Sequence, residues 1–226
     1  MKCLLLLAAC AVATGVMTSC LNSDDDEFDS KLTAEELSTY LTRLNGTYSG
    51  KLLYYRRGLD RNERDSMILD SVDHVSWAIR RDSTIIINDF PDSIYNNAIT
   101  GNADLRKVLA TAPSKTLTCT YTPYKGRTQD NTVDYGFYVI PKGTIKSNYM
   151  SSAMYTETQI TDEDGKQYEV NYGYVYIDEN RYYQANGYLS SSNYMDFMLV
   201  MTDIKCPGEY FMTQVFPVLL KGQKMY

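Results

Sequence analysis

The chain has 226 residues, of which 22 are basic and 28 acidic, so its formal net charge is −6 at pH 7. This length suits a single domain with a substantial core. The acidic balance, without a basic stripe, excludes the usual class of nucleic-acid-binding proteins, which carry a patch of positive charge.

The N-terminal residues 1–19 have the pattern of a signal peptide. Lys2 supplies a positive charge, residues 4–16 form an apolar run, and Met17-Thr18-Ser19 lead up to Cys20. The apolar run is shorter than the roughly 20 residues that a membrane-spanning helix needs. We therefore expect cleavage before Cys20, and a mature chain that carries lipid on the thiol and the amine of this cysteine.

Residues 20–31 are predicted to form an acidic tether. The lipidated cysteine is followed by Ser23, Asp24, Asp25, Asp26 and Glu27. This run resembles the export signal of Bacteroidota-type surface lipoproteins, in which a serine and a short acidic run send the protein to the cell exterior. The resemblance implies a lipid-anchored location on the outer membrane, exposed at the cell surface. The same charges also fit a plain extended tether, because like charges repel.

Residues 32–226 are predicted to form one β-rich domain that opens with a short helix. Thr33 and Glu36 have the spacing of a capping box, and Gly46 is placed to end the helix as a left-handed cap. Its apolar stripe consists of Leu37, Tyr40, Leu41 and Leu44. A helix with one apolar face must pack on something, and we expect it to cover the sheet that follows.

Along most of the remaining chain, apolar and polar residues alternate as they do in β-strands. The predicted strands are residues 46–55, 67–79, 84–90, 115–124, 132–140, 153–161, 167–178, 182–189, 194–204 and 210–220. Alternation in the second strand turns Trp77 inward and His74 outward, and Asp164-Gly165 is a strong hairpin signal. Only residues 91–113 have helical spacing. The sequence thus predicts a mainly β fold, an antiparallel β-barrel or two-sheet sandwich, with a short N-terminal helix and one helical insertion.

The junction between the first helix and the first strand reads Gly46-Thr47-Tyr48-Ser49-Gly50. A short helix that runs into G-x-Y-x-G resembles the opening of the calycin-like and lipocalin-like domains of Bacteroidota lipoproteins, although Tyr48 stands where those domains usually have tryptophan. The resemblance implies an antiparallel barrel that can enclose an apolar ligand.

Two cysteines fall within the predicted domain. In an oxidising compartment Cys119 and Cys206 could form a disulfide, which chain-entropy estimates put at roughly 4 kcal/mol; the alternative is two buried thiols. Together with His74 they make no cluster at metal-ligand spacing, so no metal or other cofactor is predicted. Asp162 and Asp164 faintly resemble a calcium loop, but a plain hairpin turn is the preferred interpretation.

Tyrosine is unusually frequent, with 21 residues in the chain. Alternation within residues 167–178 places Tyr168, Tyr172, Tyr174 and Tyr176 on one face of a strand. Such a face can bind a ligand, because the rings offer flat apolar area and the hydroxyls offer hydrogen bonds. It can equally belong to the core, since tyrosine favours strands and tolerates half-burial.

The sequence contains none of the common catalytic or nucleotide-binding motifs, so we expect no enzyme. The leading hypothesis is a lipid-anchored surface protein that binds an extracellular glycan or small amphipathic molecule through the tyrosine face. The alternative is an accessory or structural subunit that docks a partner outer-membrane protein.

Overall fold

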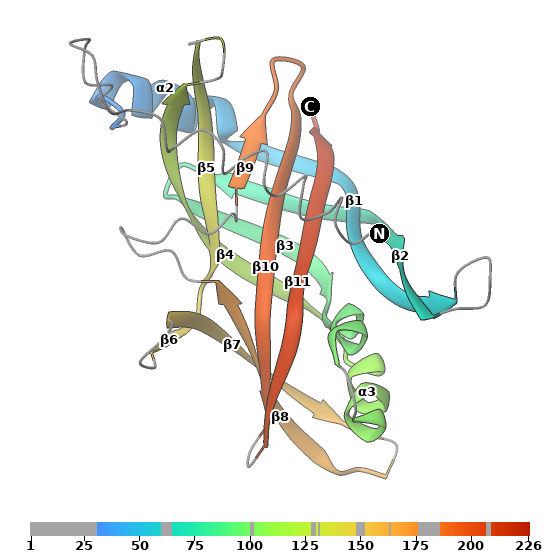
Figure 1. Cartoon of the computed structure of the whole chain (residues 1–226). Coiled ribbons are helices and arrows are strands. Elements are labelled where there is room, and N and C mark those ends of the chain that lie inside the picture. The colour runs from blue at the N-terminus through green and yellow to red at the C-terminus, as the bar shows by residue number, and fades with distance from the viewer. Residues whose placement is uncertain are drawn as a thin grey trace.

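The computed structural model describes residues 31–59, 65–99, 102–127, 130, 132–147, 152–162, 164–175, 186–206 and 209–226. The predicted signal peptide, Cys20 and the acidic run of residues 23–27 lie outside the described residues, as does Tyr176. The described part is mainly β and antiparallel, which confirms the predicted fold class (Figure 1).

Three short helices accompany the strands in the described part of the chain. The helices are α2 (Ala34–Leu44), η1 (Asp92–Ala98, a 3₁₀ helix) and α3 (Ala103–Ala110). The strands are β1 (Gly46–Leu59), β2 (Asp65–Arg80), β3 (Thr84–Pro91), β4 (Ser114–Arg127), β5 (Val133–Pro141), β6 (Thr144–Ser147), β7 (Ser152–Thr161), β8 (Gln167–Val175), β9 (Asn186–Leu189), β10 (Tyr194–Cys206) and β11 (Glu209–Lys224). The N-terminal helix and the helical insertion lie where the sequence predicted them, while the short β6 was not predicted. None of the described helices combines the length and apolar character that crossing a membrane requires.

Strand pairings run round a ring. From β1 to β5 each strand pairs with the next; β5 then pairs with β9, β9 with β10, β10 with β11, and β11 with β1. β9 pairs with the first part of β10, and β8 pairs with its last part. β7 pairs with β8, and β6 with β7, so these three strands form a branch of the sheet. The closed order of pairings is that of a barrel, which is one of the two predicted architectures.

The inward faces of the strands build the core that the alternation predicted. Trp77 on β2 is fully buried; its ring stacks on Tyr48 of β1 with centroids 5.9 Å apart and meets Phe197 of β10 edge-on at 5.6 Å. His74 is exposed, as predicted. It is the extra residue of a β-bulge, because Gly50 pairs with Val75 while Lys51 pairs with Asp73, and its φ of 62° fits that irregular position.

β1 and β11 approach each other closely at one pair of glycines. Gly50 and Gly222 are direct partners in the register. A Cβ on Gly50 would lie 1.9 Å from the backbone oxygen of Lys221, and a Cβ on Gly222 would lie 2.6 Å from the ring of Trp77. The lack of side chains at this pair therefore allows Trp77 to fill the space beside the seam.

The helix α2 lies at one end of the barrel (Figure 1). Its capping box is confirmed: the Thr33 hydroxyl accepts from the backbone N–H of Glu36 at 3.2 Å, and the Glu36 carboxylate accepts from that of Thr33 at 2.7 Å. Tyr40 and Leu44 are buried beneath the helix. The helix ends at Leu44 with Asn45 as its C-cap, so Gly46 stands just past the end, where the sequence predicted a stop. Its φ of 154° is positive but not left-handed helical, and it already pairs with Ile79 as the first residue of β1.

Candidate functional site

Two of the β8 tyrosines lie in the hydrophobic core. Tyr172 and Tyr174 are 0 % and 1 % exposed, and Tyr168 is half-buried. Tyr95 of η1 packs on this face, with its ring centroid 4.9 Å from that of Tyr172. Burial raises the pKa of the hydroxyls of Tyr95, Tyr172 and Tyr174 well above the usual range. At Tyr172 and Tyr174 the core interpretation is therefore confirmed, and an exposed binding platform is wrong because the helical insertion covers that face.

The two cysteines are thiols in the structure and not a disulfide. Cys119 on β4 is fully buried, and Cys206 at the end of β10 is half-buried. Burial raises the pKa of the Cys119 thiol well above its usual range, so this side chain stays protonated and acts as a small core residue.

The hairpin between β7 and β8 confirms the turn interpretation of Asp162 to Gly165. The Asp162 carboxylate accepts from the backbone N–H of Lys166 at 2.9 Å and from that of Asp164 at 3.0 Å, and these bonds lower its pKa. Gly165 supplies the left-handed residue, with a φ of 78°. Across the described ranges, no group of three or more His, Cys, Asp or Glu residues is placed to hold a metal ion.

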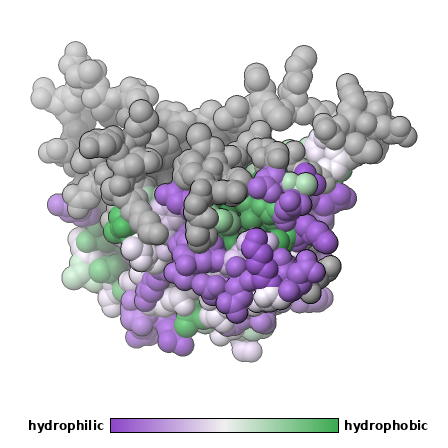
Figure 2. Space-filling view, turned by 90° about the horizontal axis from the view of Figure 1, so that it is seen from below, coloured by the Kyte–Doolittle hydropathy of each residue, from purple (hydrophilic) through white to green (hydrophobic). Residues whose placement is uncertain are grey.

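A polar cleft of about 370 Å³ is lined in part by β6 and β7. These two strands lie at the end of the barrel opposite α2 (Figure 1). The lining residues of the cleft are Lys115, Thr116, Leu117, Thr118, Lys142, Gly143, Thr144, Tyr155, Thr156, Glu157 and Asn171. We call it the β4–β7 cleft after the strands that supply most of its walls. The described surface seen from this end is mostly hydrophilic, with a small hydrophobic area among the polar side chains (Figure 2).

The cleft exists because β5 turns away from β4. Their pairing ends at Cys119 and Pro141, and the backbone N–H of Lys142 then donates to the oxygen of Thr118 at 2.7 Å. Beyond this bond the chain turns into β6, which pairs with β7 instead. The turn passes very close to β7, since a Cβ on Gly143 would lie 1.9 Å from the backbone oxygen of Tyr155.

An ion pair holds Lys115, one of the residues that line the β4–β7 cleft. Asp92, at the start of η1, is fully buried, and its Oδ2 lies 2.7 Å from the Nζ of Lys115. The hydroxyl of Thr158 donates to the same Oδ2 at 3.0 Å and also contacts the ammonium. Burial raises the pKa of Asp92, while Lys115 and Thr158 act against that shift. Lys115 is therefore held in place by a partner that water does not reach.

The ammonium of Lys115 also contacts Tyr172, one of the buried tyrosines of β8. Its Nζ lies 4.9 Å from the centroid of the Tyr172 ring, a cation–π contact. Among the described residues, the hydroxyl of Tyr172 and the Oδ1 of Asp92 are buried without a hydrogen-bond partner. Buried polar atoms are rarely left so, and a bound water is the usual partner of such atoms.

A second buried polar contact supports the other wall. The hydroxyl of Tyr155 on β7 donates to the Oδ2 of Asp203 on β10 at 2.6 Å. The Tyr155 ring and the Asp203 carboxylate meet above Gly173 of β8, where a Cβ would lie 1.9 Å from the carboxylate. The ammonium of Lys205 lies 4.2 Å from the Tyr155 ring centroid. This contact fixes the ring of Tyr155 at the edge of the cleft.

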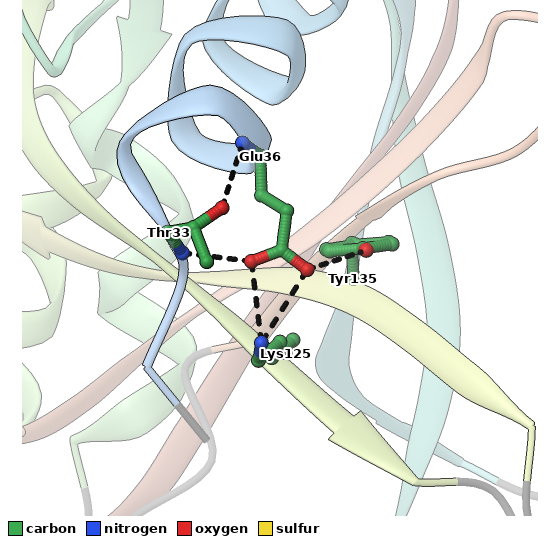
Figure 3. A network of polar contacts seen from close by, with 4 residues as sticks. All are labelled: Thr33, Glu36, Lys125 and Tyr135. Atoms are coloured by element: carbon green, nitrogen blue, oxygen red, sulfur yellow. Dashed lines mark hydrogen bonds and ion pairs between the residues drawn. The ribbon is translucent and has the colours of Figure 1, made fainter. Parts of the chain in front are cut away.

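A smaller groove of about 280 Å³ runs beside α2. It is lined by Glu35, Glu36, Thr39, Tyr40, Arg43 and Tyr135. Figure 3 shows how the carboxylate of Glu36 binds the ammonium of Lys125 at 3.2 Å and the hydroxyl of Tyr135 at 3.3 Å. The backbone N–H of Thr33, with help from Lys125, lowers the pKa of Glu36 to about 2. We assign this network to the attachment of α2 to the barrel.

Residues 43–206 match the model of a family described as a domain of unknown function, DUF4840. The match runs from the end of α2 to the end of β10 and covers more than half of the chain, so the chain belongs to this family. No curated protein and no solved structure matches the chain significantly.

Proposed function

We propose that this protein is a non-enzymatic binding protein, anchored by lipid on Cys20 at the outer face of the outer membrane, and that it holds an extracellular glycan in the β4–β7 cleft. The observation that carries the proposal is the lining of the cleft: amino groups at Lys115 and Lys142, a carboxylate at Glu157 and an amide at Asn171. Glycan hydroxyls both donate and accept hydrogen bonds, and these groups offer both kinds of partner.

The lining also favours one of the two ligand classes that the sequence suggested. An amphipathic molecule needs an apolar wall, whereas Leu117, the one aliphatic side chain that lines the β4–β7 cleft, is 3 % exposed. The ammonium of Lys115 is positioned before any ligand arrives, because the buried Asp92 fixes it. A ligand therefore gains hydrogen bonds at this point with little loss of side-chain freedom.

Display at the cell surface is proposed from the acidic run that follows Cys20. Replacing Asp24, Asp25, Asp26 and Glu27 by neutral residues should retain the lipid but abolish digestion by protease added to intact cells; equal digestion of both proteins argues that the run is only a tether.

Ligand binding is tested with full-length protein in detergent and a panel of neutral and acidic oligosaccharides, by calorimetry. At least one oligosaccharide should bind and be recovered unchanged, and Lys142→Met and Asn171→Ala should each weaken its binding tenfold or more. Lys51→Met is the matched control, because Lys51 pairs with Asp73 on the barrel wall and does not line the cleft. Failure of every oligosaccharide to bind, or equal affinity in cleft and control variants, contradicts the proposal.

The second candidate function is docking of a partner protein. It is favoured by one specific observation, the strand edge of β4 that borders the same cleft.

A further inference from the structure

Among the described residues, one edge of β4 has no strand beside it where β4 forms the wall of the cleft. On one side β3 pairs with β4 as far as Pro91 and Ser114. On the other side β5 pairs with β4 only from Cys119 onward, and the bond from Lys142 to Thr118 is the last. In the described part of the chain, Ser114 to Leu117 thus have no β5 residue beside them, and Lys115 to Leu117 of this stretch line the open cleft.

The register shows which backbone groups point into the cleft. In an antiparallel strand the N–H and C=O of one residue point to the same side, and the sides alternate along the chain. The oxygen of Thr118 points to the β5 side, since it accepts from Lys142. Thr116, two residues earlier, therefore directs both its N–H and its C=O into the cleft.

We propose that an extended polypeptide segment of a partner protein adds to this edge as a strand antiparallel to β4, continuing the path that β5 leaves at Lys142. The inference goes beyond glycan binding, and shares with it only the location. Unpaired strand edges accept such segments through backbone hydrogen bonds, with side chains supplying the specificity. The free edge from Ser114 to Leu117 has room for a segment of about four residues, at roughly 3.4 Å each.

The side chains around the edge indicate the chemistry of the segment. Ser114 and Thr116 are exposed, small and polar, and residues 114–117 contain no proline that would block pairing. Where β5 departs, the exposed Lys142 has its ammonium 3.4 Å from the hydroxyl of Thr84, a neutral partner. The ammonium of Lys115 is already paired with the buried Asp92, and the lining also contains the carboxylate of Glu157, so Lys142 is the group toward which an acidic side chain is directed. A segment with an acidic side chain near Lys142 therefore complements the cleft better than a basic one.

A matched pair of substitutions at Thr116 separates backbone pairing from side-chain recognition. Thr116→Pro removes the N–H that points into the cleft and disturbs no pair on the β3 side, because the Thr116 N–H does not point there. Thr116→Val removes the hydroxyl but retains the N–H. The probe is a fluorescent synthetic decapeptide of alternating valine and threonine with one central aspartate, and its counterpart has lysine at that position.

Binding is measured by fluorescence anisotropy with full-length protein in detergent, and the aspartate peptide should bind the unchanged protein. Its affinity for Thr116→Pro should be at least tenfold weaker, whereas its affinity for Thr116→Val should be within twofold of that for the unchanged protein. The lysine peptide should bind at least fivefold more weakly than the aspartate peptide. If thermal unfolding shows that Thr116→Pro does not fold, peptides methylated at successive backbone nitrogens replace it, and methylation at alternate positions should abolish binding to the unchanged protein.

Two outcomes overturn the inference. One is the absence of binding by either peptide; the other is equal binding to both Thr116 variants or to all methylated peptides. An oligosaccharide that binds Thr116→Pro and the unchanged protein equally, while the peptides fail, supports glycan binding alone. Peptide binding by a protein that binds no oligosaccharide supports the strand and contradicts the glycan.

Discussion

The hydroxyl oxygens of Tyr95 and Tyr174 lie 3.0 Å apart inside the barrel, although 79 positions separate the two residues in the chain. This bond joins the helical insertion to β8. Tyr95 also packs edge-on against Phe216 of β11, with centroids 5.7 Å apart. The insertion is therefore part of the core and not an appendage on the surface.

Tyr174→Phe should destabilise the protein by about 1–2 kcal/mol, because it leaves the buried hydroxyl of Tyr95 without its partner. Tyr172→Ala should cost about 3–4 kcal/mol through the cavity that it creates. Tyr188→Ala is the control; Tyr188 is 43 % exposed, and the change should cost less than about 0.5 kcal/mol. Denaturant unfolding measures all three. Similar costs at Tyr172 and Tyr188 contradict the burial of the tyrosine face.

Gly222→Ala should destabilise the barrel by about 2 kcal/mol or more, because its methyl group would meet the backbone of Ser49 at 2.4 Å and the ring of Trp77 at 2.6 Å. Gly126→Ala on β4 is the matched control, since the nearest side-chain atom to its Cβ would be 4.0 Å away. Thermal unfolding of the two variants compares them. A melting temperature of Gly222→Ala equal to that of the control means that the seam between β1 and β11 is looser than described.

Stability should depend on pH through Glu36. The pKa of this carboxyl is about 2 in the folded protein against 4.5 ordinarily, so its contribution is complete above pH 4.5 and is lost as the pH falls through 2. Glu36→Gln should therefore lower the melting temperature near neutral pH, and the difference from the unchanged protein should shrink between pH 4.5 and 2. A difference that stays constant down to pH 2 shows that the charge of Glu36 contributes nothing.

Removing Lys115 alone from its ion pair with Asp92 should cost more stability than changing both residues. Lys115→Met leaves Asp92 buried without its cation and should cost about 3–5 kcal/mol. Adding Asp92→Asn to Lys115→Met removes the unpaired charge and should restore most of that loss. Denaturant unfolding of the single and double variants gives the coupling between them. If the double variant is no more stable than Lys115→Met, the loss comes from packing and not from charge.

Cys20→Ala should abolish lipid attachment, because the predicted acylation and the cleavage before residue 20 both depend on this cysteine. Metabolic labelling with a fatty-acid analogue measures this, and Cys119→Ala should label fully, since its thiol is buried. Label on the Cys20→Ala protein contradicts the predicted anchor.

Patterns within single segments predicted much of the fold. The capping box of Thr33 and Glu36, the inward Trp77 and the hairpin at Gly165 each follow from interactions between residues close in the sequence, or from the period of one strand. The period of a strand shows which side chains share a face, but not which other element of the fold covers that face. The alternation placed Tyr172 and Tyr174 together correctly, but their burial depends on the distant Tyr95.

The candidate site was not predicted from the sequence for a related reason. Asp92 and Lys115 lie in different elements, and neither belongs to a recognisable motif; they meet because β4 returns along β3 past the start of η1. The cleft itself results from the place where β5 leaves β4, and the four-residue β6 that follows is too short to give a clear alternating pattern. Only the assembled sheet reveals either feature.

The pairing of β1 with β11 sets the order in which this chain can fold. The ring has no closing partner for its first strand until its last strand has been synthesised, and the contacts between them span most of the chain. Such long-range pairings form slowly, because chain entropy opposes them until late. A nascent chain with this topology therefore cannot close its ring until β11 has left the ribosome.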